Sequence, residues 1–278
     1  MEQPLLLSTA GRELVGILHR PSGPAQAGVV VLVGGPQYRV GSHRQFVLLA
    51  RALSRLGIAV LRFDYAGMGD SDGSAPSFER VDPEIRAAVD TLLSACPEIE
   101  TVCLWGLCDA ASSALMYAPG DPRVNRLVLL NPWVRTSEGQ AQAYIENYYG
   151  KRLRNPRTWR KFSRDPAALL RAAASWVRNF AKAQHGARNG GGFLAKMLAG
   201  AQAYRGRTLV LLSGRDLVAT EFELLLSRAE PWRIAFSGER VRTAKLENAS
   251  HTFARAEWRD WVTDHTARFL LDGAAPGR

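Results

Sequence analysis

Cysteine is scarce in this sequence, as are segments that would direct a chain to a membrane. Its 278 residues include three cysteines, Cys96, Cys103 and Cys108, which lie within one short stretch. An odd, clustered set does not predict a disulfide framework and fits a reducing compartment. The first residues lack a basic cluster, and Leu5–Leu7 is too short for a signal peptide or a transmembrane span. We therefore expect a cytoplasmic protein.

Acidic residues are scarce in one segment, from Val134 to Ala203. The segment contains thirteen Lys or Arg residues and three acidic ones, whereas the rest of the chain contains 23 of each sign. The net charge of +10 therefore belongs to this segment alone. It shows helical periodicity and no convincing strand pattern, so we expect a basic helical insertion. No recognition motif accompanies the charge, and we do not expect a nucleic-acid partner.

The rest of the chain alternates between apolar runs and helical patterns. We expect a hairpin from the strands 5–8 and 13–19. Further strands are expected at 28–34, 58–63, 99–105, 124–130, 208–213 and 241–246, and helices at 43–56, 82–95, 109–118 and 254–271. This alternation predicts an α/β fold with a mostly parallel sheet and helices on both faces. It stops at Pro132 and resumes at Arg207, so we expect a core of residues 1–133 and 204–278 and a cap of residues 134–203.

The segment Cys103-Leu-Trp-Gly-Leu-Cys-Asp-Ala110 is the strongest indication of chemistry. It joins an expected strand to a helix rich in small residues, as a nucleophile elbow does, with cysteine where serine usually stands. Gly106 is the first small neighbour that the tight turn requires, and Ala110 replaces the second glycine. A thiol at a helix N-terminus is favoured as the thiolate. The alternative is a buried cysteine followed by a helix cap at Asp109.

Three other strand ends supply partners for this cysteine. Gly34-Gly-Pro36 follows a β-branched strand, and because proline cannot donate, we expect the backbone N–H groups of Gly35 and Asp109 to form an oxyanion hole. Asp216 and His251 each follow a later strand. The order nucleophile, acid, histidine predicts a catalytic triad of Cys108, Asp216 and His251.

The turn Asp64-Tyr-Ala-Gly-Met-Gly-Asp-Ser71 follows another expected strand. Its pattern of Asp, two glycines and Ser is typical of a turn held by side chains, and we assign it no chemistry.

The chain resembles the α/β-hydrolase superfamily along nearly its whole length, which implies the α/β-hydrolase fold. More narrowly, the motifs Gly34–Phe46, Gly106-Leu-Cys-Asp109 and Leu130-Asn-Pro-Trp-Val-Arg135 resemble the exosortase A system-associated hydrolases (type 1), bacterial proteins of exopolysaccharide and protein-sorting loci. The resemblance implies a bacterial hydrolase and leaves the substrate open. Gln37, His43 and Trp133 are candidate pocket residues, although His43 could instead begin a helix with Ser42 and Arg44.

The expected activity is hydrolysis of an ester or thioester, which needs no cofactor and no metal ion. Two other functions remain open: an acyltransferase that uses the same cysteine, and a non-catalytic module that binds an anionic partner. The expected substrate is a small acyl compound, free or linked to a lipid or carrier. The cap could contact an anionic surface, and Lys151-Arg-Leu-Arg154 could meet the phosphates of a carrier. The oligomeric state is open.

Overall fold

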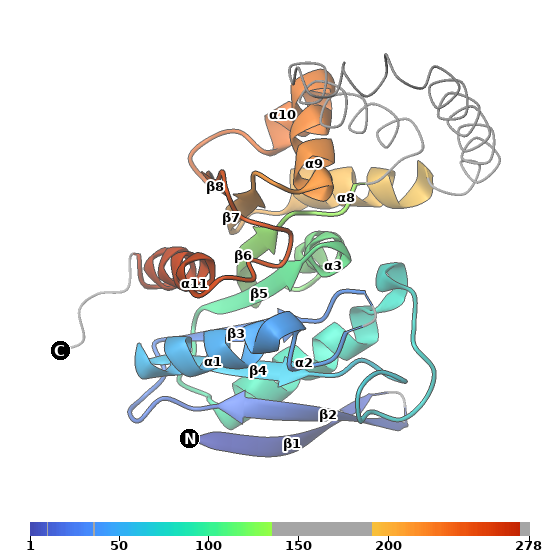
Figure 1. Cartoon of the computed structure of the whole chain (residues 1–278). Coiled ribbons are helices and arrows are strands. Elements are labelled where there is room, and N and C mark those ends of the chain that lie inside the picture. Colours follow the sequence, from blue (N-terminus) through green and yellow to red (C-terminus); the bar gives the residue numbers. More distant parts are fainter. Residues whose placement is uncertain (10, 36, 135–190, 273–278) are drawn as a thin grey trace, which may run out of the picture.

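The computed structural model describes residues 1–9, 11–35, 37–134 and 191–272, which form an eight-stranded sheet covered by helices (Figure 1). The strand order is β1-β2-β4-β3-β5-β6-β7-β8. β1 (Glu2–Thr9) and β2 (Arg12–His19) form an antiparallel hairpin, and β2 pairs antiparallel with β4 (Ile58–Phe63). The remaining pairs are parallel. The mostly parallel sheet that the sequence predicts is therefore confirmed.

The apolar runs of the sequence become the central strands. β3 (Ala27–Leu32), β4 and β5 (Val102–Leu107) are buried at every position. β6 (Val124–Leu130) and β7 (Arg207–Ser213) are buried along most of their length, whereas the last strand, β8 (Val241–Leu246), is half-exposed. A parallel strand between two helical layers buries both of its faces, which is why these strands read as continuous apolar runs.

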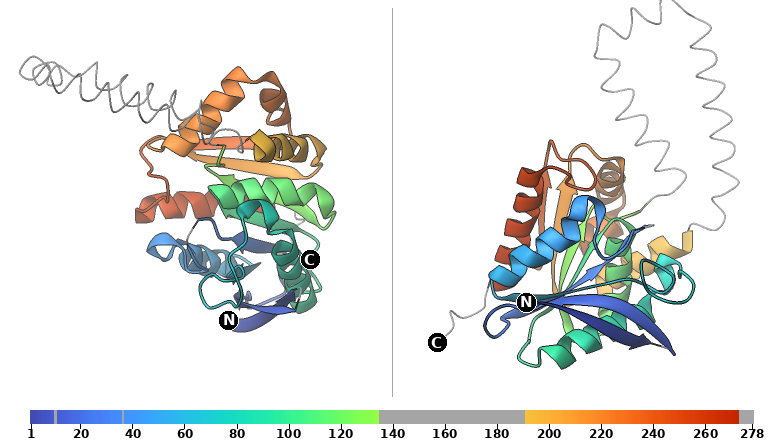
Figure 2. Two further views of the ribbon diagram at one scale, coloured as in Figure 1. Left: turned by 90° about the vertical axis from the view of Figure 1, so that its right-hand side faces the viewer. Right: turned by 60° about the horizontal axis from the view of Figure 1, so that its bottom comes forward.

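Helices cover both faces of the sheet. α1 (Gln45–Arg55) and α11 (Ala256–Leu271) pack together on one face, whereas α2 (Asp82–Ala95), α3 (Asp109–Tyr117) and α8 (Gly191–Ala203) lie on the other (Figure 2). The parallel strands all end at the same edge of the sheet. Loops at the carboxyl ends of such strands are where α/β proteins bind ligands. The candidate site residues that follow these strands are therefore gathered along one edge.

The structure departs from the expected elements in a few places. α1 begins at Gln45, after one turn of 3₁₀ helix, η1 (Ser42–Arg44), because His43 and Arg44 have φ of 54° and 60°. Two helices between β7 and β8 were not expected, α9 (Leu217–Arg228) and α10 (Glu230–Ala235). The short 3₁₀ helices η2 (Phe78–Arg80) and η3 (Ala118–Gly120) complete the described elements.

Most of the predicted cap, including Lys151–Arg154, lies outside the described residues. The described parts are Val134, which is buried, and α8, which packs against α3 and extends the helical layer on that face. The division into core and cap stays a prediction. In the part of the chain that the structure describes, no helix has both the length and the apolar character to cross a membrane.

Candidate active site

Cys108 occupies a strained turn between β5 and α3. Its φ is 65° and its ψ is −125°, a conformation that residues other than glycine rarely adopt. Holding it costs about 1–3 kcal/mol, a kind of strain that gathers at functional sites. Gly106 is required because a Cβ there would lie 2.6 Å from the backbone of Ala110. The cysteine side chain is partly exposed, as a nucleophile at an elbow must be.

The loop after β6 holds the elbow in place. The N–H of Cys108 donates to the carbonyl of Leu130 at 2.9 Å, and the carbonyl of Cys108 accepts from the N–H of Trp133 at 3.2 Å. The hydroxyl of Ser112, in α3, donates to the carbonyl of Trp133 at 2.7 Å. Trp133, a candidate pocket residue, thus contacts the elbow through its backbone and is partly buried against the core.

Asp216 and His251 form the second half of the site. Nδ1 of His251 lies 2.7 Å from Oδ2 of Asp216, whose side chain is almost fully buried. Asp216 is also the N-cap of α9, where its carboxylate accepts from the N–H groups of Val218 at 3.2 Å and Ala219 at 3.3 Å. The helix therefore fixes the carboxylate that orients the imidazole.

The environment of His251 favours its charged form. Burial alone would lower the pKa of the imidazole, but hydrogen-bonding and charge interactions with Asp216 and Cys108 outweigh burial and raise it to about 10. The structure thus brings together the three residues that the sequence proposes as a triad.

The oxyanion donors are arranged differently from the expectation. Gly35 is exposed and has a φ of 59°, but its N–H donates to the side chain of Asp109, at 2.9 Å to Oδ1 and 3.0 Å to Oδ2. The same carboxylate accepts from the N–H of Ala110 at 3.0 Å. Burial raises the pKa of the Asp109 carboxyl, and its hydrogen bonds with Gly35 and Ala110 offset this only in part. In this structure Gly35 is therefore not a free donor.

The other two candidate pocket residues lie in the loop between β3 and α1. Oε1 of Gln37 accepts from the N–H of Ser42 at 3.1 Å and from its hydroxyl at 3.3 Å, which closes the loop on itself. His43 is exposed in the left-handed turn η1. It does not begin α1 as a cap, because that helix starts two residues later. A pocket role for Gln37 and His43 stays a prediction.

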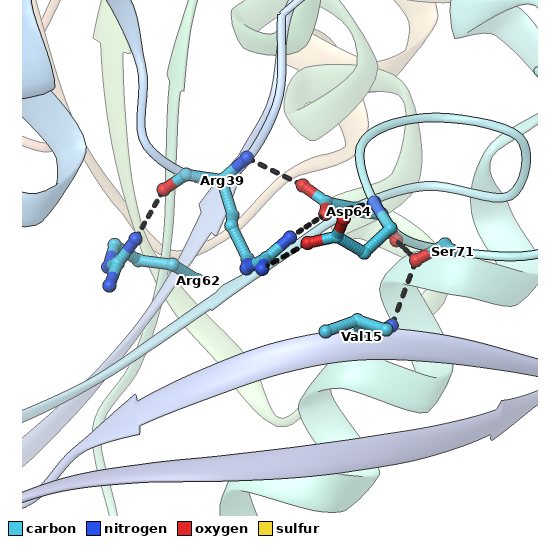
Figure 3. A network of polar contacts seen from close by, with 6 residues as sticks. Val15, Arg39, Arg62, Asp64 and Ser71 are labelled. Carbon is cyan, nitrogen blue, oxygen red and sulfur yellow. Dashed lines mark hydrogen bonds and ion pairs between the residues drawn. The ribbon is translucent and has the colours of Figure 1, made fainter.

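The turn that follows β4 anchors this loop (Figure 3). Asp64 is fully buried and accepts from the N–H of Arg39 at 2.6 Å and from its guanidinium. The hydroxyl of Ser71 donates to the carbonyl of Asp64 at 2.9 Å and accepts from the N–H of Val15 at 2.8 Å. Arg62, on β4, donates to the carbonyl of Arg39. The side chains of this turn thus hold its structure, as the sequence predicts, and also fasten the loop that carries Gly35.

Asn131 is a site residue that the sequence analysis did not identify. It follows β6, is fully buried and has a φ of 43°. Its Nδ2 donates to the hydroxyl of Ser213 at 2.8 Å and to the carbonyl of His251 at 3.0 Å, and its Oδ1 accepts from the N–H of Ser213 at 2.9 Å. Asn131 could have been identified from the sequence, because it directly follows an expected buried strand and so lies at the same edge of the sheet as the other candidate residues.

No metal-binding site is evident in the described part of the chain. No group of three or more His, Cys, Asp or Glu side chains there is arranged to hold an ion.

Comparisons with known proteins agree with this fold. A model of the alpha/beta hydrolase family matches residues 29–265. An esterase from Pyrococcus furiosus is 16% identical over 99% of this chain and 92% of its own, with a TM-score of 0.67. An alpha-beta serine hydrolase homologue from Coxiella burnetii is 15% identical, with 98% and 97% covered and a TM-score of 0.58.

Est1E from Butyrivibrio proteoclasticus, whose structure holds ferulic acid, is 15% identical, with 96% of this chain and 98% of its own covered and a TM-score of 0.63. No curated protein sequence gives a significant match. These structural likenesses show the fold, and the family model spans most of the chain from β3 into α11. The chain belongs to the α/β-hydrolase family.

Proposed function

We propose that this protein hydrolyses carboxylic esters or thioesters through a covalent acyl intermediate on Cys108. The observation that carries the proposal is the geometry at the elbow. Cys108 lies in a strained, partly exposed turn and interacts with His251, whose other ring nitrogen lies 2.7 Å from the Asp216 carboxylate. A nucleophile, a base and an acid that orients the base are the parts of an acyl-transfer site.

Acylation begins with attack of the Cys108 thiolate on the carbonyl carbon. A C–S bond forms, and the carbonyl π electrons move onto the oxygen. The bond to the leaving group then breaks, and the imidazolium of His251 gives its proton to the departing alkoxide or thiolate. The raised pKa of His251 supports this order, since the imidazole already holds the proton before attack.

Deacylation uses the same groups in reverse. Neutral His251 takes a proton from water, and the hydroxide oxygen attacks the carbonyl carbon of the enzyme thioester. The C–S bond breaks and Cys108 leaves as the thiolate, which restores the ion pair with the imidazolium. Asp216 stabilises the imidazolium and holds the ring in the required orientation throughout.

The developing oxyanion needs donors beside Cys108. The N–H of Asp109, at the N-terminus of α3, and the N–H of Gly35 are the proposed donors. Loss of one such donor typically costs about 10²–10³-fold in kcat. The contact between Gly35 and the Asp109 carboxylate must therefore open before Gly35 can take part.

The proposed substrates are activated esters, lactones or thioesters. A thiolate is a strong but soft nucleophile, and it suits these acyl groups better than amides. The Pyrococcus furiosus esterase, a solved structure of similar fold, supports ester chemistry. The thirteen basic residues between Val134 and Ala203 support an acyl group linked to an anionic carrier or lipid. The resemblance of the three sequence motifs supports a place in a bacterial exosortase system.

Hydrolysis of p-nitrophenyl esters of increasing acyl length tests this proposal. Wild type is compared with Cys108→Ala and Cys108→Ser, and Cys96→Ala, which changes a buried cysteine at the end of α2, serves as the matched control. We expect Cys108→Ala to lose about 10³-fold or more in kcat/KM. Cys108→Ser should retain part of the activity, and the control should retain most of it. Equal turnover by wild type and Cys108→Ala would contradict the proposal.

A further inference from the structure

The carboxylate of Asp109 accepts a hydrogen bond from the backbone N–H of Gly35, which is one of the two proposed oxyanion donors. Both of its oxygens are within hydrogen-bonding distance of the Gly35 nitrogen, at 2.9 Å and 3.0 Å. Hydrogen bonds from an N–H to a charged carboxylate are roughly twice as strong as those between neutral groups. The Asp109 side chain also packs closely against Gly34, because a Cβ at position 34 would collide with Oδ1 of Asp109. The glycine pair is therefore packed directly on this side chain.

A substrate cannot use the Gly35 N–H while the carboxylate holds it. An N–H group has one hydrogen to donate, so an incoming carbonyl oxygen and the carboxylate compete for it. Asp109 directly follows the nucleophile, and its own N–H is the second proposed donor. One residue thus supplies a donor through its backbone and a competitor through its side chain.

We propose that the Asp109 side chain is a resident competitor in the oxyanion hole and a determinant of acyl specificity. This inference rests on the proposed function of Cys108. The carbonyl oxygen of the substrate must displace the carboxylate from Gly35, and the displaced carboxylate stays beside the site because α3 holds its backbone. Uncharged acyl groups can tolerate this neighbour. Acyl groups with a carboxylate of their own near the carbonyl are repelled by it.

The environment of Asp109 is compatible with displacement. Burial raises the pKa of its carboxyl, which means that the carboxylate is less stable there than in water, apart from the hydrogen bonds of Gly35 and Ala110. The positive charge of His251 acts in the opposite direction. A carboxylate held by few partners in a partly buried place can give way to a carbonyl oxygen that the rest of the site holds in position.

Two aldehydes of equal length test the inference: butyraldehyde, which is neutral, and succinic semialdehyde, which carries a carboxylate. The Cys108 thiolate adds to either carbonyl carbon, the π electrons move to the oxygen, and the resulting thiohemiacetal oxyanion occupies the oxyanion hole beside the imidazolium. Dissociation constants are measured for wild type, Asp109→Asn and Asp109→Ala. Alkylation of Cys108 by iodoacetamide, which creates no oxyanion, corrects for changes in thiolate reactivity.

After this correction we expect Asp109→Ala to bind butyraldehyde about 10-fold more tightly than wild type does, because one charged competitor is removed. Asp109→Asn should be intermediate, since the amide oxygen is a weaker, neutral acceptor. The gain for succinic semialdehyde should be larger than the gain for butyraldehyde. Asp109→Asn retains an acceptor for the N–H of Ala110. This variant therefore still tests the inference if Asp109→Ala destabilises α3.

Unchanged or weaker binding of both aldehydes in both variants, with Cys108 still alkylated, would overturn this inference and leave the proposed nucleophile standing. An equal gain for the two aldehydes would overturn the specificity that we assign to Asp109. No adduct on Cys108 with either aldehyde or with iodoacetamide, in any variant, would overturn the proposed function and this inference together.

Discussion

Asp216 has two roles at the scale of a single residue. Its carboxylate contacts Nδ1 of His251 and also caps α9 through the N–H groups of Val218 and Ala219. The cap makes the position of the carboxylate independent of the imidazole. A preformed acid of this kind keeps the ring oriented before the substrate arrives.

The two roles of Asp216 can be separated with a matched pair of variants. Asp216→Asn keeps a good N-cap but removes the charge that favours the imidazolium, so we expect kcat to fall by about 10²–10⁴-fold with little loss of stability. Asp216→Ala should lose a similar amount of kcat and a further ~1 kcal/mol of unfolding free energy. Ester turnover and urea unfolding measure the two effects. If Asp216→Asn kept wild-type kcat, the assigned role of the acid would be wrong.

Sequence patterns identified the candidate site residues but not their side-chain contacts. Cys108, Asp216 and His251 each follow a strand, and parallel strands end at one edge of the sheet, so their proximity could be predicted. The contact between Asp109 and Gly35 could not, because it depends on how closely one loop approaches one helix. The capping role of Asp216 was also missed, and the helix α9 was missed with it.

At the scale of elements, the ends of β6 and β7 and the histidine loop are joined by one side chain. Asn131, at the end of β6, binds the backbone and hydroxyl of Ser213, at the end of β7, and the carbonyl of His251. Its φ of 43° is one that asparagine adopts more readily than most residues. This link sets how far the histidine loop stands from the elbow.

Asn131→Ala should therefore lower both stability and activity. It leaves buried groups of Ser213 and His251 without a partner, which we expect to cost about 2–4 kcal/mol of unfolding free energy. Ser213→Ala is the matched control, because it removes one hydrogen bond and keeps the bond to His251. We expect kcat of the folded fraction to fall at least about 10-fold in Asn131→Ala and much less in Ser213→Ala. Equal kcat losses in the two variants would contradict a positioning role for Asn131.

At the scale of the whole molecule, the sheet joins a polar cluster near the N-terminus to the loop that carries Gly35. His19, on β2, is buried and accepts from Nε of Arg62, on β4, at 3.0 Å. Arg62 in turn donates to the carbonyl of Arg39 in that loop. Burial, and then the charge of Arg62, lower the pKa of His19 to about 4. The folded protein therefore keeps this histidine neutral.

This histidine makes stability depend on acid. Between pH 6.5, its ordinary pKa, and about pH 4, the unfolded chain binds a proton at His19 that the folded chain does not. The neutral His19 therefore contributes its full share to the unfolding free energy above pH 6.5. As the pH falls towards 4, this share is lost, and the unfolding free energy decreases by up to about 3 kcal/mol. We expect the unfolding free energy of His19→Gln to fall less steeply than that of wild type over this range. Parallel pH profiles would contradict a neutral, buried His19.

The central claim, a covalent acyl intermediate on Cys108, is tested most directly by intact-protein mass spectrometry. Wild type and Cys108→Ala are quenched with acid during turnover of p-nitrophenyl butyrate, and peptide mapping locates any adduct. We predict a butyryl adduct on Cys108 in wild type and none in Cys108→Ala. An adduct on another residue, or undiminished turnover by Cys108→Ala, would contradict the account.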